Sequence, residues 1–302
     1  MTLHPRVEDR NLSLLWLALG GRVRGVLTMK KDQTMTTPLL AVAAASALLL
    51  CAAPISAAQA ETNNAYVMGA FGGTFTWETG NTARLTEEFI TGNGILVPSD
   101  VVFPPQTVAE FTTQFEPGYF GVLALGKQSI YGPFRSELEL SWTKSSVDRH
   151  EDLNVGGLSL SLADAAVLTG AETPTERNVS QVFGDGDGQL STYSLMVNFY
   201  WDIEVPAKDV RPYIGLGGGV TLVNVDYTPS SLTVVSDQDT VLGYQLMFGI
   251  AADLNPRTVL HTGFRVRDTA EIDMRTDKNL LSSKLDFDVN QTTIEVGLRR
   301  HF

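Results

Sequence analysis

Cysteine is almost missing from this chain of 302 residues, which contains only Cys51. One cysteine cannot form an internal disulfide, so the cross-links that stabilise many exported proteins are excluded. Cys51 follows Leu50 and not the small residue that precedes an acylated cysteine, so we expect no lipid anchor there. The fold must therefore be stable without covalent cross-links.

Basic residues are also scarce. There are 22 lysines and arginines against 34 aspartates and glutamates, which gives a formal net charge of −12 at pH 7. Binding to nucleic acid requires a basic surface, because most of the affinity comes from contacts with phosphates. This acidic balance excludes nucleic acid as a partner. It is compatible with long solvated loops, and acid-rich loops can also hold divalent cations.

Long apolar runs are missing with one exception, from Leu39 to Ala53. Its 15 residues are fewer than the roughly 20 that a membrane-spanning helix needs. The run follows the basic stretch Met29-Lys30-Lys31 and precedes Ala58-Gln59-Ala60. A basic region, an apolar region of this length and an A-x-A site are typical of a secretory signal peptide.

These features divide the chain into a leader and one exported domain. We predict a leader over residues 1–60, with the signal peptide in 29–60 and cleavage before Glu61. Residues 1–28 are either an unusually long N-terminal region or the product of a misassigned start codon. Residues 61–302 form the mature domain, in which no stretch is apolar enough for a membrane helix.

The mature domain contains segments in which apolar and polar residues alternate. Eight segments of about ten residues alternate between apolar and polar side chains, as in strands with one apolar face. In TYSLMVNFYWD, for example, Leu195 and Val197 lie on one face and Asn198 on the other. Clusters of Gly, Pro, Asp and Asn separate the segments. The predicted strands cover about 64–77, 118–126, 134–144, 192–202, 210–222, 243–254, 259–267 and 290–302.

The links between these strands alternate in length. In an up-and-down meander, alternate links emerge at the same end, so all the long links share one end and all the short ones the other. Outer-membrane barrels have this arrangement, with short periplasmic turns and long extracellular loops. The short links are 127–133, 204–209 and 255–257, and the long ones are about 78–117, 146–190, 226–240 and 268–287.

We therefore predict an all-β fold, a closed antiparallel up-and-down transmembrane β-barrel of eight strands with long extracellular loops. The last strand must pair with the first, because unpaired backbone groups in hydrocarbon cost several kcal/mol each. Ten strands are the alternative. FITGNGILV (89–97) could form a hairpin around Asn93-Gly94, and Leu158, Leu160 and Leu162 alternate within the second long link.

The positions of the aromatic residues decide which face meets lipid. Trp77, Trp142 and Trp201 all lie at strand ends, where indole rings favour the membrane interface. The apolar face is then lipid-facing and the charged face lumenal. An eight-stranded barrel is just wide enough for side chains to fill it, so these charges should pair rather than leave a pore. We predict a lumenal polar network of Arg135, Glu137, Glu139, Arg211, Arg265, Arg267, Glu295 and Arg299.

Over about 64–302 the chain resembles the small eight-stranded outer-membrane β-barrels of Gram-negative bacteria, of the opacity-protein and surface-antigen type, similar to the OmpA transmembrane domain. The resemblance implies that the terminal aromatic residue, Phe302, is the assembly signal read by the barrel-assembly machinery. Arg300 departs from the pattern, in which an aromatic or aliphatic residue precedes the end by two. The resemblance rests on AYVMGAFGG, FEPGYFGVLALG, RSELELSW, STYSLMVNFYWD, RPYIGLGGGV, GYQLMFGIAADLNPR and IEVGLRRHF.

The sequence offers little for catalysis or metal binding. No serine–histidine pair lies at short strand spacing near a lipid-facing position, so we expect no enzyme, no catalytic residue and no cofactor. Asp185 and Asp187 in GDGDGQ could ligate calcium, but the other acids of an EF-hand loop are missing. Turn chemistry explains the stretch as well.

The loops are then the candidate functional element, because loops on a rigid scaffold commonly carry recognition. We expect a non-enzymatic surface protein of the bacterial outer membrane that contributes to envelope integrity, adhesion or host contact. The alternatives are a narrow porin-like diffusion channel and, ranked below it, an enzyme that modifies lipid A. The expected partners are outer-membrane lipid, the barrel-assembly machinery and a host or cell-surface ligand.

Overall fold

A computed structural model describes residues 64–91, 101–129, 132–169, 173–184, 186–206, 210–227, 235–276 and 282–302. These all belong to one of two compact units, Leu40–Phe302. The described residues form about 15 strands and almost no helix, so the prediction of an all-β, antiparallel up-and-down fold is confirmed. None of the helices in these ranges has the length and hydrophobicity to cross a membrane. The predicted leader lies outside the described residues.

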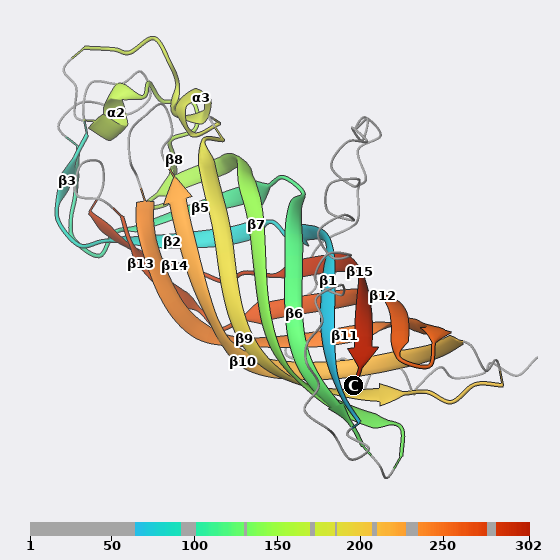
Figure 1. Cartoon of the computed structure of the whole chain (residues 1–302). Helices are drawn as coiled ribbons and strands as arrows, with labels where there is room; N and C mark the ends of the chain where they lie inside the picture. The colour runs from blue at the N-terminus through green and yellow to red at the C-terminus, as the bar shows by residue number, and fades with distance from the viewer. Residues whose placement is uncertain are drawn as a thin grey trace, which may run out of the picture. The chain divides into compact units, whose positions relative to one another are not determined.

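Eight strands cover the segments whose alternation predicted them. Each runs antiparallel to its neighbours, and Figure 1 shows them side by side. We call them the main strands. They are β1 (Ala65–Thr76), β6 (Gly118–Gln128), β7 (Phe134–Val155), β9 (Gly188–Asp202), β10 (Val210–Tyr227), β11 (Val235–Asn255), β12 (Thr258–Thr269) and β15 (Gln291–His301).

The main strands pair in the order β7-β6-β1-β15-β12-β11-β10-β9. β9 in turn pairs with β7, so Leu140 lies opposite Leu195 on one side and opposite Leu123 of β6 on the other. The last strand lies beside the first, with Leu298 opposite Gly69. We call the end with the links β6–β7, β9–β10 and β11–β12 the short-turn end, and the opposite end the loop end.

Burial along the main strands is inverted relative to a water-soluble β protein. In β7, Glu137 and Glu139 are 2% and 0% exposed, whereas Leu138 and Leu140, which alternate with them, are 50% and 53% exposed. Successive side chains of a strand point to opposite faces, so one face carries the charges and is buried. The outer face is apolar, which is favourable only in contact with an apolar solvent.

The long links do not consist of loops alone, which corrects the sequence prediction. β7, β9, β10 and β11 continue past the predicted strand ends, and new strands lie in the links before β6 and β15. We call these new strands, together with the end of β7, the outer sheet; its order is β13-β14-β2-β5-β7. The strands are β2 (Thr79–Leu85), β5 (Val108–Phe115), β13 (Ile272–Arg275) and β14 (Ser283–Phe287).

In the described residues, the two segments that suggested ten strands form only two-residue strands. β3 (Phe89–Ile90) pairs with β4 (Val102–Phe103) in a separate small sheet, and Asn93-Gly94 lies outside the described residues. β8 (Leu158–Ser159) folds back on the end of β7 through Gly156 and Gly157, both at positive φ. Two short helices follow, α2 (Ala166–Thr169) and α3 (Val179–Phe183).

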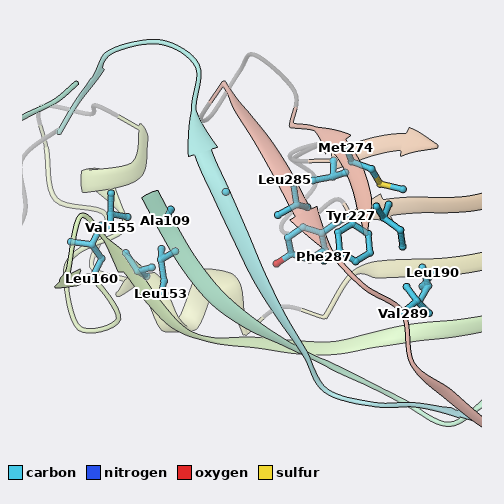
Figure 2. Close-up of a cluster of buried hydrophobic side chains, with 14 of the residues drawn as sticks. Ala109, Leu153, Val155, Leu160, Leu190, Tyr227, Met274, Leu285, Phe287 and Val289 are labelled. Atoms are coloured by element: carbon cyan, nitrogen blue, oxygen red, sulfur yellow. The ribbon is translucent and has the colours of Figure 1, made fainter. Parts of the chain in front are cut away.

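The largest cluster of buried apolar side chains in the described residues lies at the loop end, where the outer sheet meets the ends of β9, β10 and β11. Figure 2 shows Tyr227, Leu285 and Phe287 directed toward one another, beside Met274. In Figure 1 the strands β2, β5, β13 and β14 lie on the side where α2 and α3 are found, away from the C-terminus. We call this cluster the outer core. It includes Ala83, Ala109, Leu153, Val155, Leu160, Val179, Leu190, Val223, Tyr227, Val235, Ile272, Met274, Leu285, Phe287 and Val289.

Candidate functional site: the polar interior

Glu139 of β7 is the centre of the buried polar face. Arg265 of β12 donates to both of its carboxylate oxygens, at 2.6 and 2.8 Å. Arg267, two residues along the same strand and on the same face, donates to Oε1 at 3.3 Å. Asn198 of β9 donates to Oε2 at 2.7 Å. Strands distant in sequence therefore meet at one carboxylate.

Other polar groups saturate the two arginines at this centre. Arg265 also contacts Glu295 of β15 at 3.1 Å, and Gln245 accepts from it at 2.9 Å. Arg267 donates to Gln245 at 2.8 Å and to the hydroxyl of Ser141, also at 2.8 Å. Buried charges are tolerated only when they are paired and hydrogen-bonded, and these two meet that condition.

A second cluster lies toward the short-turn end. Arg135 donates to Glu137 at 2.5 Å and to Asp202 at 3.1 Å, and its guanidinium lies 3.7 Å from the centroid of the Tyr200 ring. The hydroxyl of Tyr66 on β1 donates to Glu137 at 2.8 Å. This cluster thus links β1, β7 and β9.

The two other predicted arginines are placed differently. Arg299 is 3% exposed and lies over the ring of Tyr66, 5.1 Å from its centroid, and its Nε and Nη1 have no hydrogen-bond partner within the described part of the chain. Arg211 forms a bidentate ion pair with Asp253, with both hydrogen bonds at 2.6 Å, and both side chains are partly exposed. Arg211 is therefore separate from the central cluster.

Toward the loop end the charges give way to hydroxyl and amide groups. Thr143 lies 2.7 Å from Thr192, and the amide of Gln291 donates to Thr143 at 3.2 Å. Thr76 lies 3.0 Å from Ser145. The interior therefore changes from ion pairs to neutral hydrogen bonds and then to the apolar outer core.

Little space is left among these side chains. A cavity between Arg135, Glu137, Tyr200 and Arg299 measures about 10 Å³, close to the smallest volume that holds one water. Gly217 shows how tight the packing is, because a Cβ there would lie 1.9 Å from the Asn198 side-chain oxygen. Glycine in β10 makes room for the network on its neighbours.

The outward-facing aromatic residues lie at two levels. Trp142 pairs with Tyr193 near the loop end, and Phe134 pairs with Trp201 at the short-turn end. Trp77 also lies near the loop end, where its indole donates to Thr292 at 2.9 Å. At the other end the backbone of Phe302 donates to Ala65 of β1 at 3.2 Å.

The remaining candidates do not form a site with the interior. Asp187 lies at an open polar depression beside Glu116, Asp148 and Asp226, and Asp185 lies outside the described residues. Within the described ranges no group of three or more His, Cys, Asp and Glu side chains is placed to hold a metal ion.

Part of this interior could not be found from the alternation. Tyr66 belongs to the strand whose faces are blurred by glycine, and Asp202 lies at the predicted end of its strand. Tyr200 appears on the polar face of TYSLMVNFYWD, which was the available signal. The alternation could not show that Tyr200 stacks on Arg135, because Arg135 lies opposite it on the neighbouring strand β7.

A β protein with charges inside and an apolar surface of this kind belongs to the class of outer-membrane barrels. Comparison with known proteins agrees. The surface antigen family matches residues 114–299, more than half of the chain. The chain belongs to the surface antigen family, a family of bacterial outer-membrane β-barrel proteins, and the resemblance stated from the sequence is confirmed. No curated protein matches the sequence.

Solved structures give weaker similarities. Outer membrane protein OprG from Pseudomonas aeruginosa is 12% identical, with a TM-score of 0.43, over 82% of this chain and 100% of that one. Neisserial surface protein A is 12% identical, with a TM-score of 0.38, over 79% and 97%. The outer membrane protease OmpT from Escherichia coli is 8% identical, with a TM-score of 0.41, over 82% and 99%.

Proposed function

We propose that the eight main strands close into a transmembrane barrel with a filled interior, which holds the outer sheet at the cell surface. The observation that carries this proposal is the inversion of burial, with Glu139 fully buried and Leu140 about half exposed. The return of the strand order from β9 to β7 supports closure. Closure pairs the edge strands, whose backbone N–H and C=O groups would otherwise lack hydrogen-bond partners in hydrocarbon.

The distance between the aromatic levels fits an outer membrane. Trp142 lies eight positions after Phe134, which at roughly 3.3 Å per residue is about 26 Å along the strand. A strand tilted by about 40° covers roughly 20 Å of the membrane normal over that length. The aromatic rings at both ends add to this height, which then approaches the apolar band of about 25 Å typical of such barrels.

The orientation follows from the lengths of the links. We place the short-turn end in the periplasm and the loop end with its outer sheet outside, as in barrels of this class. Export by the signal peptide in 29–60 and insertion by an assembly machinery that reads Phe302 belong to the same proposal. The partners are then outer-membrane lipid and, at the outer sheet, a host or cell-surface ligand.

The barrel itself neither conducts nor catalyses in this proposal. Its interior is occupied by ion pairs and hydrogen bonds, and the residual cavity beside Arg299 is about 10 Å³. In a planar bilayer we expect no conductance steps from the wild-type protein or from the double variant Glu137→Gln, Glu139→Gln. Regular steps in either protein would favour the alternative, a narrow diffusion channel. Incubation with lipid A followed by mass spectrometry checks the absence of catalysis.

The surface role is tested with whole cells. Cells that display the full chain should adhere to host cells or matrix more strongly than cells whose protein has a short turn in place of 156–184. That segment holds β8, α2 and α3, none of which is a main strand. If both kinds of cell adhere equally, with equal amounts of heat-modifiable protein in the membrane, the segment does not contribute to adhesion.

A further inference from the structure

The outer core lines a cavity that the polar interior and the surface role leave unexplained. Its volume is about 90 Å³. The walls come from seven strands: β2, β5, β7, β9, β10, β11 and β14. Figure 2 shows several of these side chains, with Leu285, Phe287 and Tyr227 on one side and Leu153 on the other. The apolar lining includes Ala83, Ala109, Leu153, Val235, Leu285 and Phe287.

The few polar groups in the wall are engaged with one another. The hydroxyl of Thr113 lies 2.7 Å from Asn81 Nδ2 and 2.7 Å from His150 Nδ1. The His150 ring packs edge-on against Tyr227, with centroids 4.3 Å apart. Burial lowers the pKa of His150 to about 4, so the ring is neutral at physiological pH. No charged side chain is present in the described lining.

This chemistry favours an apolar occupant over water. A buried water needs two to four polar partners, and an apolar cavity of roughly 150 Å³ stays dry and binds benzene or xenon. At about 90 Å³ this space is smaller than that cavity, so we expect a guest no larger than benzene. An empty cavity lowers stability in proportion to its volume, so a guest that fills it is stabilising.

The edge between β11 and β13 borders the cavity, because Val235 of β11 and Thr276, which directly follows β13, are in its lining. There the backbone N–H groups of Asp273 and Arg275 donate to the carboxylates of Asp239 and Asp237, each at 3.0 Å. β13 pairs with β14 and ends the outer sheet, so side chains and not a backbone ladder make this junction. Such a junction can open without breaking a strand pairing.

We propose that this cavity is a binding site for a compact apolar molecule, of the size of benzene or smaller, which enters between β11 and β13. The proposal does not depend on the adhesive role of the outer sheet. It depends on the apolar lining, the volume of the cavity and the mutual hydrogen bonding of Asn81, Thr113 and His150.

The test uses the full chain in lipid nanodiscs with ¹³C-labelled leucine and valine methyl groups, titrated with benzene. Methyl shifts of Leu153 and Leu285 should change and saturate, because both side chains line one binding site. Methyls of Leu140 and Val197 on the outer face should shift in proportion to benzene, because they report partition into lipid. If the cavity methyls do not shift, or shift only in proportion with Leu140, the proposal is wrong.

Filling the cavity provides the matched variant. Ala109→Leu should weaken benzene binding by about tenfold or more, because the larger side chain occupies the space. Ala83→Leu is an independent variant if Ala109→Leu does not fold. For both variants, unchanged Leu140 methyl shifts and heat-modifiable mobility show that the protein is folded. Wild-type affinity in a folded filling variant would contradict the assignment.

Discussion

Glu139 shows at the scale of one residue what the polar interior requires. The sequence pattern placed it on the charged face, but no local pattern could say that Arg265 and Arg267 share its carboxylate. Those contacts arise from strands more than a hundred residues apart that meet inside the ring of pairings. Predicting the face was possible because side chains alternate, whereas predicting partners requires the register.

Glu139→Gln should lower the free energy of unfolding by about 3 to 5 kcal/mol, because it leaves Arg265 and Arg267 buried with too little negative charge. Urea unfolding in detergent micelles, followed by the loss of the fast-migrating form on unheated gels, measures this. Glu110→Gln is the control, since Glu110 lies on the exposed face of β5. Equal stability of the two variants would show that the network contributes little.

His150 is the residue through which acid should affect the outer core. Burial lowers its folded-state pKa from 6.5 to about 4, so below pH 6.5 the unfolded segment binds a proton that the folded one does not. The stability of the outer sheet should therefore be constant above pH 6.5 and fall progressively between pH 6.5 and 4. Hydrogen exchange of β5 amides at pH 7 and pH 5 measures this loss.

The same experiment on His150→Gln separates this group from other acid effects. Glutamine does not titrate, so the difference in β5 exchange between pH 7 and pH 5, after correction for intrinsic rates, should be smaller than in the wild type. An undiminished difference would mean that another group is responsible.

At the scale of elements, the main strands were predictable and the outer sheet was not. TYSLMVNFYWD alternates over its whole length because each face meets a different environment. β2 (TGNTARL) and β14 (SKLDF) are short and polar, and only residues such as Ala83 and Leu285 reach the outer core. Their strand conformation depends on neighbours contributed by distant links, so the sequence indicated loops.

The segment between β7 and β9 should be dispensable for the barrel but not for the outer core. Replacing 156–184 with a short turn removes Leu160 and Val179, which are 0% and 1% exposed. We expect a heat-modifiable barrel in which the outer sheet is cleaved faster by protease. Loss of heat modifiability would show that the main strands need this segment, and wild-type protease resistance would show that the outer core does not.

At the scale of the molecule, the buried interior changes in character from one end to the other. Ion pairs around Glu139 and Arg135 occupy the short-turn end and the middle, hydroxyl groups such as Thr143 follow, and the outer core is apolar. The outward surface of the main strands is apolar instead, with aliphatic side chains between two aromatic levels. In the proposed barrel, the main strands meet lipid with their apolar face and keep the ion pairs on the buried face.

Cysteine accessibility tests this claim most directly. In a Cys51→Ser background, Val197→Cys and Phe248→Cys place a thiol on the apolar face, where the native side chains are 47% and 45% exposed. Gln238→Cys places one on the exposed side of β11 near the loop end. In whole envelopes, a water-soluble maleimide should label Gln238→Cys and leave the other two unmodified, while a membrane-partitioning maleimide labels them. Rapid labelling of Val197→Cys and Phe248→Cys by the water-soluble reagent would contradict the account.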